Sequence, residues 1–302
     1  MSVSIFSCQR LSPSELGDYA FMLKPDLHPA LEGSVAVGAS CLGRPVGLAL
    51  ARVDRTRQEA DLFWLHVQPA CRGNALGRAL LLELEAAIAQ EGCQSARMVY
   101  TTETPDYPAI ERVLAACGWS SPQVRFHLYR ADARSIQGMP LLRVALPPEF
   151  TVFPWLELTL GEKQEILRSQ RLQPWYPEAL SPFKEEETIH PVSLGLRKGG
   201  EIVGWMVAHV TGESLRYSTL FVKREYQRAG RAIGLLAEVI KRNLDAPIQE
   251  AQWAISPSNL GMRRLAERRI RSYASWTGES RLSTKRVSRM CATSYDACDR
   301  FR

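Results

Sequence analysis

The stretch FVKREYQRAGRAIGLLA, residues 221–237, decides the fold of this chain. Phe221 and Val222 end an apolar run that predicts a buried strand, and the charged residues after them end the strand. From Ile233 onward, apolar residues recur with the spacing of an amphipathic helix. Small residues at positions 229, 230 and 232 let an anion approach the main chain, and the start of a helix directs unpaired N–H groups toward it. The stretch therefore predicts an anion-binding turn between a strand and a helix.

The same pattern occurs once earlier in the chain, in VQPACRGNALGR, residues 67–78. Residues 62–67 predict a strand, and a helical stripe of apolar residues follows from position 76 to position 84. Val67 precedes Val222 by 155 positions, and Arg72 precedes Gln227 by the same 155 positions, about half of the 302-residue chain. The equal spacing indicates an internal repeat.

A second pair of segments supports this repeat. Residues 35–47, VAVGASCLGRPVG, and residues 192–204, VSLGLRKGGEIVG, align without gaps at an offset of 157 and share two valines and three glycines. Each segment predicts a hairpin, which turns at Gly43 in the first half and at Gly199-Gly200 in the second. The length fits two domains of about 150 residues, each able to bury its own core.

Both turns resemble the acyl-CoA-binding turn of the GCN5-related N-acetyltransferase (GNAT) superfamily, whose signature is Gln/Arg-x-x-Gly-x-Gly/Ala. The second turn, QRAGRA at residues 227–232, fits every specified position; the first keeps Arg72 and Gly77 but has Ala75 in place of the first glycine. The resemblance implies an α/β (α+β) fold of two tandem GNAT-like domains. Each would have a mixed, mostly antiparallel central sheet flanked by helices, with one splayed pair of parallel strands. Acetyl-CoA is the implied co-substrate, and no metal is implied.

The resemblance also implies which residues contact acetyl-CoA. In the second half they are Val222, Gln227, Arg228, Ala229, Gly230, Arg231, Ala232 and Asn259. In the first half they are Val67, Arg72, Gly73, Asn74, Ala75, Gly77 and Arg78. A backbone N–H at the end of either strand would hold the thioester oxygen while an amine attacks the carbonyl carbon directly, without a covalent enzyme intermediate.

The chain departs from the family at the position of the catalytic base. Many members have a glutamate five residues before the valine that ends the splayed strand, but Leu62 and Tyr217 stand there in this chain. Strict alternation predicts that Trp64 and His66 share the face of Leu62. It likewise predicts that Thr219 and Phe221 share the face of Tyr217. His66 has a pKa suited to base catalysis near neutrality. Its alternative role is that of a hydrogen-bonded core residue.

The proton donor of the family is also absent from its usual place. Members often carry Asn-x-x-Ala-x-x-x-Tyr on the final helix; here Asn259 matches the first position and Ala266 stands at the tyrosine position. Tyr217 and Tyr273 are candidate replacements that would protonate the CoA thiolate. A thiolate with a pKa near 8.5 can also leave without full protonation.

The complete signature and Asn259 favour the C-terminal half as the active one, which transfers an acetyl group to an amine. One alternative places activity in the N-terminal half, with His66 as the base. Another is a non-catalytic acyl-CoA sensor or scaffold. The acceptor would be a small-molecule or peptide amine, whose identity the sequence leaves open together with the acyl chain length and the oligomeric state.

The predicted organisation follows the order of the chain. Residues 1–135 form an N-terminal GNAT-like domain, 136–148 a linker, 149–288 the C-terminal GNAT-like domain and 289–302 a polar tail. A segment rich in proline and aromatic residues, 173–183, stands where the family places a substrate-facing loop. Its alternative role is a rigid loop that packs Trp175 and Phe183 on the core.

Composition narrows the class of protein. Seven cysteines without a C-x-x-C pair and five scattered histidines indicate neither a zinc site nor a disulfide framework. No apolar run is long enough to span a membrane and the N-terminus has no signal-peptide pattern, so we expect a cytoplasmic protein without a membrane partner. The net charge is +6, and five arginines fall within residues 263–271. These arginines would lie on a solvated helix face, bind the phosphates of CoA or, as the least favoured alternative, bind nucleic acid.

Overall fold

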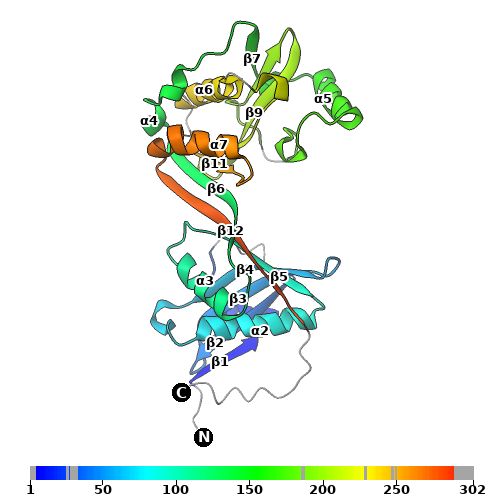
Figure 1. Cartoon of the computed structure of the whole chain (residues 1–302). Coiled ribbons are helices and arrows are strands. Elements are labelled where there is room, and N and C mark those ends of the chain that lie inside the picture. Colours follow the sequence, from blue (N-terminus) through cyan, green and yellow to red (C-terminus); the bar gives the residue numbers. More distant parts are fainter. Residues whose placement is uncertain are drawn as a thin grey trace. The chain divides into compact units, whose positions relative to one another are not determined.

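The computed structural model describes residues 5–24, 27, 33–184, 188–227, 230–245, 248 and 250–288. The chain divides into two compact units (Figure 1). The first contains the chain up to Arg125 and again from Glu279 onward, and the second contains Phe126–Gly278. Each unit has its own buried cores, so each is described separately.

Six strands of the sheet lie in the first unit, in the order β1-β2-β3-β4-β5-β12. Its strands are β1 (Phe6–Arg10), β2 (Ser34–Cys41), β3 (Arg44–Asp54), β4 (Glu59–Val67), β5 (Ser95–Thr101) and the final strand of the chain, β12 (Trp276–Arg286). Its helices are α1 (Pro13–Leu16), α2 (Leu76–Gln90) and α3 (Tyr107–Ala116), with 3-10 turns η1 (Gly17–Met22) and η3 (Pro69–Cys71). Only β4 and β5 pair in parallel; the other described pairs are antiparallel.

Helix α2 packs across β2, β3 and β4 and against α3 (Figure 1). Its apolar stripe, including Leu80, Leu84 and Ile88, is fully buried. It forms one core with Leu62 of β4 and Met98 of β5. The opposite face of the sheet carries a smaller core, in which Leu48 and Leu50 meet Tyr19 and Met22 of η1.

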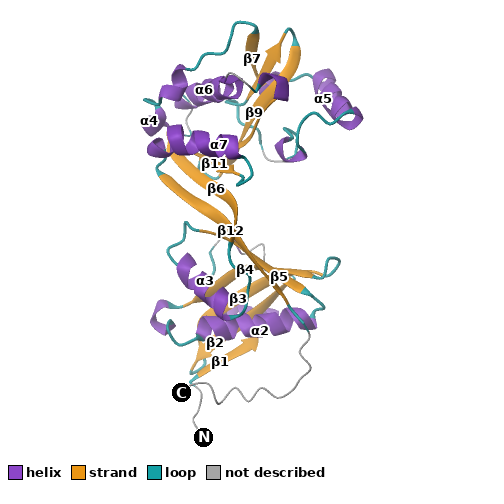
Figure 2. Cartoon of the chain, in the orientation of Figure 1, coloured by secondary structure: helices purple, strands orange, loops and turns teal. Residues whose placement is uncertain are grey.

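The second unit repeats this arrangement, with the sheet order β6-β11-β10-β9-β8-β7. Its strands are β6 (Gln123–Asp132), β7 (Phe150–Pro154), β8 (Leu194–Lys198), β9 (Glu201–Thr211), β10 (Ser214–Val222) and β11 (Glu250–Ile255). Its helices are α4 (Ala133–Ile136), α5 (Leu160–Leu172), α6 (Arg231–Leu244) and α7 (Leu260–Leu265), and a π-helical turn (Ala266–Ile270) continues α7. Shorter 3-10 turns are η4 (Pro140–Arg143), η5 (Trp155–Glu157), η6 (Glu178–Leu180), η7 (Arg224–Tyr226) and η10 (Arg271–Tyr273). As in the first unit, a single described pair, β10 with β11, is parallel. Figure 2 shows the strands of both units in orange and their helices in purple.

Both predicted hairpins are confirmed. The β2–β3 turn has positive φ at Leu42 (49°) and Gly43 (77°), and the β8–β9 turn has it at Gly199 (56°) and Gly200 (86°). Two consecutive residues with φ > 0 form the turn whose twist matches that of the flanking strands. The two halves therefore use the same backbone conformation although one has leucine where the other has glycine.

The compact units do not follow the predicted boundaries at 135 and 149. Strand β6, expected to complete the first domain, pairs with β11 from Glu250↔Asp132 to Ile255↔His127. Strand β12, expected to complete the second domain, pairs with β5 from Ser280↔Thr101 to Arg286↔Ser95. The final strand of each predicted domain thus belongs to the sheet of the other half. The order of strands in a sequence carries no signal for such an exchange.

The predicted linker, residues 136–148, also contributes to a core. Ile136, Met139 and Leu141 are at most 4% exposed and lie in the core beneath α6. Leu146 contacts Gly234 so closely that a Cβ there would come within 2.8 Å of its side chain. These apolar contacts make the segment part of the second unit. The predicted tail, from residue 289 onward, lies outside the described residues.

Candidate functional site

Each unit contains a pair of parallel strands that separate partway along their length. In the first, β4 pairs with β5 from Glu59↔Ser95 to Leu62↔Met98. In the second, β10 pairs with β11 from Ser214↔Glu250 to Tyr217↔Trp253. Beyond these pairs, no ladder joins the strands among the described residues. The last five residues of β4 and of β10 thus form one side of a fork, which opens at equivalent positions of the repeat.

A β-bulge lies immediately after each fork opens. The pairing of β4 with β3 shifts between Leu62 and Trp64, which leaves Phe63 as the extra residue. The pairing of β10 with β9 shifts in the same way between Tyr217 and Thr219. A bulge changes which residues share a face, because two residues of the bulged strand oppose one residue of its partner.

The bulges overturn the expectation that Trp64 and His66 share the face of Leu62. Leu62 lies in the core under α2, whereas Trp64 packs with η1 on the opposite face and stacks against His66, with ring centroids 5.9 Å apart. In the second unit, Tyr217 packs under α6, whereas Phe221 lies on the opposite face. Strict alternation was wrong here, since it ignores the extra residue.

The end of each forked strand is held by the first residue of the signature. Arg72 donates from Nε to the carbonyl oxygen of Val67 at 3.1 Å, and Gln227 donates from Nε2 to the carbonyl oxygen of Val222 at 2.8 Å. Arg72 also makes a bidentate contact with Asp106, at 2.8 and 2.9 Å. The signature position thus has the same structural role whether it is arginine or glutamine.

The N–H groups of Val67 and Val222 point into the forks. The next residues, Gln68 and Lys223, donate their N–H to the neighbouring strand, to the carbonyls of Val46 and Val203 at 2.8 Å. Successive backbone groups point to opposite sides of a strand, so the preceding N–H is directed toward the separated partner. This is the position in which a backbone donor can meet a thioester oxygen.

A left-handed residue begins each helix that follows. Ala75 (φ 55°) is the N-cap of α2 and Gly230 (φ 81°) is the N-cap of α6, and neither helix has a side-chain cap. The N–H groups of the first turn are therefore open to an external acceptor, and the helix dipole favours an anionic one. Gly73 (φ 84°) precedes the first helix, and Asn74 donates to the carbonyl of Cys71 at 3.3 Å.

The remaining predicted CoA contacts vary in their surroundings. Gly77 faces α3, and a Cβ at this position would come within 3.2 Å of the side chain of Val113. The close packing of α2 on α3 therefore explains why a glycine stands there. Ala232, in the first turn of α6, packs against the core that this helix covers. Arg231 lies 5.4 Å from the ring of Phe150. Arg78 lies in the first turn of α2. Arg228 and Ala229 lie outside the described residues.

The two forks differ in how far they are exposed. In the first unit, every residue from Phe63 to Gln68 is partly exposed. In the second, Thr219, Phe221 and Val222 are 9%, 5% and 2% exposed. The first fork is therefore the more accessible to a substrate.

Loop 173–183 covers the face of β10 that carries Phe221. Trp175 contacts Phe221 and Trp205, with ring centroids 5.6 and 5.4 Å apart, and Tyr176 lies 5.0 Å from Trp205. The side chain of Gln170 accepts from the N–H groups of Trp175 and Tyr176 at 3.0 and 3.2 Å and donates to the carbonyl of Tyr176 at 2.9 Å. The alternative that this loop packs on the core is confirmed, and Phe183 joins the same cluster.

The candidate titratable groups lie in different environments. His66 is partly exposed, and burial, reinforced by the positive charge of Arg72, lowers its pKa below the ordinary value. Burial raises the pKa of Tyr217, opposed by the amide of Asn243. The carbonyl of Tyr273 accepts from Ser135 at 2.9 Å. Asn259 caps α7, accepting from the N–H of Met262 at 3.1 Å. Of these groups, His66 is the titratable one on an accessible face of a forked strand.

The arginine-rich segment 263–271 has mostly solvated side chains. Arg264, Arg268, Arg269 and Arg271 are exposed, and Arg271 pairs with Glu267 at 2.8 Å. Among the described residues, no group of His, Cys, Asp and Glu side chains is arranged to hold a metal ion. Within the same ranges, no helix is both long and apolar enough to cross a membrane.

Comparison with known families identifies the repeat. The model of the acetyltransferase (GNAT) family matches the chain twice, at residues 6–119 and 157–270. The chain belongs to the GNAT family. Its two units are therefore tandem GNAT domains, and membership supports acyl-CoA-dependent N-acyltransfer as the general activity. None of the curated proteins matches the sequence.

Solved structures of the same architecture cover nearly the whole chain. A tandem GNAT protein from the clavulanic acid biosynthesis pathway has a TM-score of 0.58 at 14% identity, covering 95% of this chain and 100% of its own. A GCN5-related N-acetyltransferase from Sphaerobacter thermophilus has a TM-score of 0.56 at 17% identity, with coverages of 95% and 98%. At these identities the similarity concerns the fold.

Proposed function

We propose that this GNAT chain transfers an acetyl group from acetyl-CoA to an amine by direct attack. The observation that carries the proposal is the repeated geometry at each fork. A strand ends with its N–H directed into the fork, and a left-handed residue then begins a helix without a side-chain cap. Such a strand end can bind the thioester oxygen, and such a helix start can bind the diphosphate.

We further propose that the N-terminal domain accepts the amine. The sequence favoured the C-terminal domain, because its signature is complete. Two structural observations support the N-terminal domain instead: its fork is partly exposed throughout residues 63–68, and Ala75 adopts the left-handed conformation that Gly230 has in the other domain. The C-terminal domain would bind the thioester carrier and support its neighbour.

His66 would act as the base in this domain. The amine nitrogen bonds to the acyl carbon, the carbon–sulfur bond breaks, and CoA leaves as the thiolate. The ammonium proton passes to His66, directly or through a water. Because burial and Arg72 lower the pKa of the imidazole, it is mostly neutral near pH 7 and able to take that proton. The N–H of Val67 stabilises the charge that develops on the carbonyl oxygen.

A specific observation keeps the C-terminal domain as a second candidate. Gln227 holds the end of its forked strand as Arg72 does in the other domain, and Gly230 begins its helix with the same left-handed conformation as Ala75. Its candidate proton donors are Tyr217 and Tyr273, but burial holds the proton on Tyr217 more tightly.

Acetyl-CoA-dependent thiol release over a panel of amines tests the proposal. We expect release above background hydrolysis for at least one amine, a strong loss of release in Ala75→Val and retained release in Gly230→Val. Loss only in Gly230→Val would assign activity to the C-terminal domain. Tight acetyl-CoA binding without release for any amine would favour a sensor or scaffold.

A further inference from the structure

Three strands of the N-terminal domain carry a row of charges on the face that also carries His66. In the register of the strands, Arg52 of β3 lies opposite Asp61 of β4, and Asp61 lies opposite Arg97 of β5. Their neighbours Ala51, Leu62 and Met98 lie in the core under α2. Since side chains alternate along each strand, the row lies on the opposite face. Asp61 and His66 share this face only because the bulge at Phe63 shifts the alternation.

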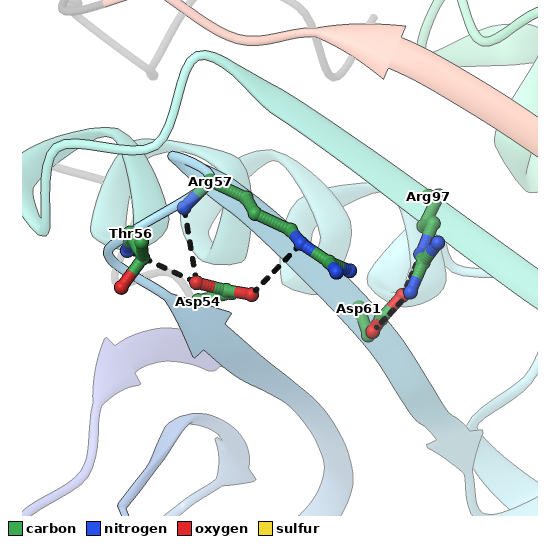
Figure 3. Close-up of polar contacts among 5 residues, drawn as sticks. All are labelled: Asp54, Thr56, Arg57, Asp61 and Arg97. Atoms are coloured by element: carbon green, nitrogen blue, oxygen red, sulfur yellow. Dashed lines mark hydrogen bonds and ion pairs between the residues drawn. The ribbon is translucent and has the colours of Figure 1, made fainter.

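The row borders an open hollow of about 500 Å³. Its charged lining consists of four arginines, at positions 52, 55, 57 and 97, and two aspartates, at 54 and 61, so its net charge is +2. Figure 3 shows Arg57 extending from the β3–β4 turn toward Asp61, with Arg97 bound to the same carboxylate. The hollow therefore favours an anion.

Two of these guanidinium groups retain capacity for a ligand. Arg52 lies 5.8 Å from the ring of Phe63 and has no carboxylate partner among the described residues. Arg57 contacts Asp54 through one long ion pair of 3.8 Å, and Asp54 is already bound by the N–H groups of Thr56 and Arg57 at 3.0 Å. By contrast, Arg97 is held by Asp61 through two contacts, and Arg55 pairs with Glu91 at 2.7 Å.

The CoA diphosphate does not account for this hollow. The phosphate turn follows the last residue of β4, whereas the hollow lies at the first residues of that strand, roughly 20–25 Å away at the usual rise per residue. The fold does not require the row either. At the equivalent positions of the C-terminal domain stand His209, Arg216 and Gln252.

We propose that the acceptor of the N-terminal domain is an anionic amine, whose carboxylate or phosphate binds Arg52 and Arg57 while its amine reaches His66. This inference rests on the proposed function of that domain. The rise of β4 from Asp61 or Phe63 to His66 places the acidic group roughly 10–15 Å from the reacting nitrogen. An extended peptide with an acidic residue at its fourth position spans that distance.

The test compares three peptides that differ in one side chain: GGGXG-amide with glutamate, glutamine or phosphoserine at X. Binding to the full chain is measured by calorimetry in the presence of CoA, which permits no transfer. We expect the two anionic peptides to bind at least tenfold more tightly than the glutamine peptide. The double variant Arg52→Gln/Arg57→Gln should reduce this preference to less than threefold. Arg44→Gln, at an exposed arginine outside the hollow, is the matched control and should leave it unchanged.

Equal binding of the three peptides, absence of binding, or a preference that survives the double variant would overturn the inference. If the double variant does not fold, the wild-type preference must instead shrink as NaCl rises from 0.02 to 0.5 M, because salt screens exposed charges. Thiol release is measured in parallel with acetyl-CoA. Tighter binding of the anionic peptides without thiol release for any amine would contradict the proposed function but not the anion site. Equal thiol release from all three peptides would contradict only the proposal that the acceptor is anionic.

Discussion

The left-handed residues at the two helix starts provide a reciprocal test of the repeated turn. Ala75 has φ 55° and Gly230 has φ 81°, so each residue can be replaced by the one its counterpart carries. A Cβ at Gly230 would meet no atom within 4 Å, and Gly230→Ala therefore introduces backbone strain without a steric clash. Left-handed strain costs about 1–2 kcal/mol for a residue with a Cβ, and the lower chain entropy of the unfolded alanine variant offsets about 0.4–1 kcal/mol of it.

The net expectation is about 1 kcal/mol in opposite directions: Gly230→Ala destabilises its domain and Ala75→Gly stabilises its own. In a domain of about 150 residues, this change shifts the melting temperature by about 2–4 °C. Scanning calorimetry of the full chain measures both shifts, with each unit's transition followed separately. Gly212→Ala is the matched control, because Gly212 also has a left-handed φ (59°) and open space but lies in the β9–β10 turn. Gly212→Ala should destabilise its domain as much as Gly230→Ala does, without changing the affinity for acetyl-CoA. If Ala75→Gly destabilised its domain, the assigned turn conformation would be refuted.

Three further predictions concern side chains. His66→Gln should lower the turnover of the N-terminal domain by about 100-fold and remove the acid limb of the pH–rate profile. In the wild type, the midpoint of this limb should lie below the ordinary pKa of histidine, because burial and Arg72 lower the pKa of His66. An unchanged profile would exclude His66 as the base. Lys285→Met breaks a 2.5 Å ion pair with the nearly buried Glu85, and urea unfolding should show a loss of about 2–3 kcal/mol, whereas a loss under 0.5 kcal/mol would contradict this role. Gln170→Leu removes three hydrogen bonds to loop 173–183; we expect a loss of about 1–3 kcal/mol and stronger acrylamide quenching of Trp175, and equal quenching would mean that Gln170 does not hold the loop.

The two strand–turn–helix segments that carry the signature and the two hairpins could be predicted from sequence because their signals are local. A glycine at Gly43, Gly200 or Gly230 marks a backbone that must adopt positive φ, and the constant spacing between the halves makes each weak motif support the other. Ala75 shows where this reasoning weakens. It departs from the signature, yet it has the conformation of the glycine it replaces.

The faces of the forked strands could not be predicted in the same way. A bulge is defined by pairing with a neighbouring strand, and nothing in the local sequence around Phe63 marks the extra residue. This single residue moves His66 from the core face to the accessible face. The exchange of β6 and β12 between sheets was hidden for a similar reason, because it depends on contacts between segments more than 100 residues apart.

The stoichiometry of acetyl-CoA binding, measured by calorimetry, tests most directly whether the chain has two main-chain sites for the thioester carrier. We expect two molecules per wild-type chain, and one after either Ala75→Val or Gly230→Val, since a β-branched side chain is strongly disfavoured at positive φ. No binding to the wild type, or two sites that persist in the double variant, would contradict it.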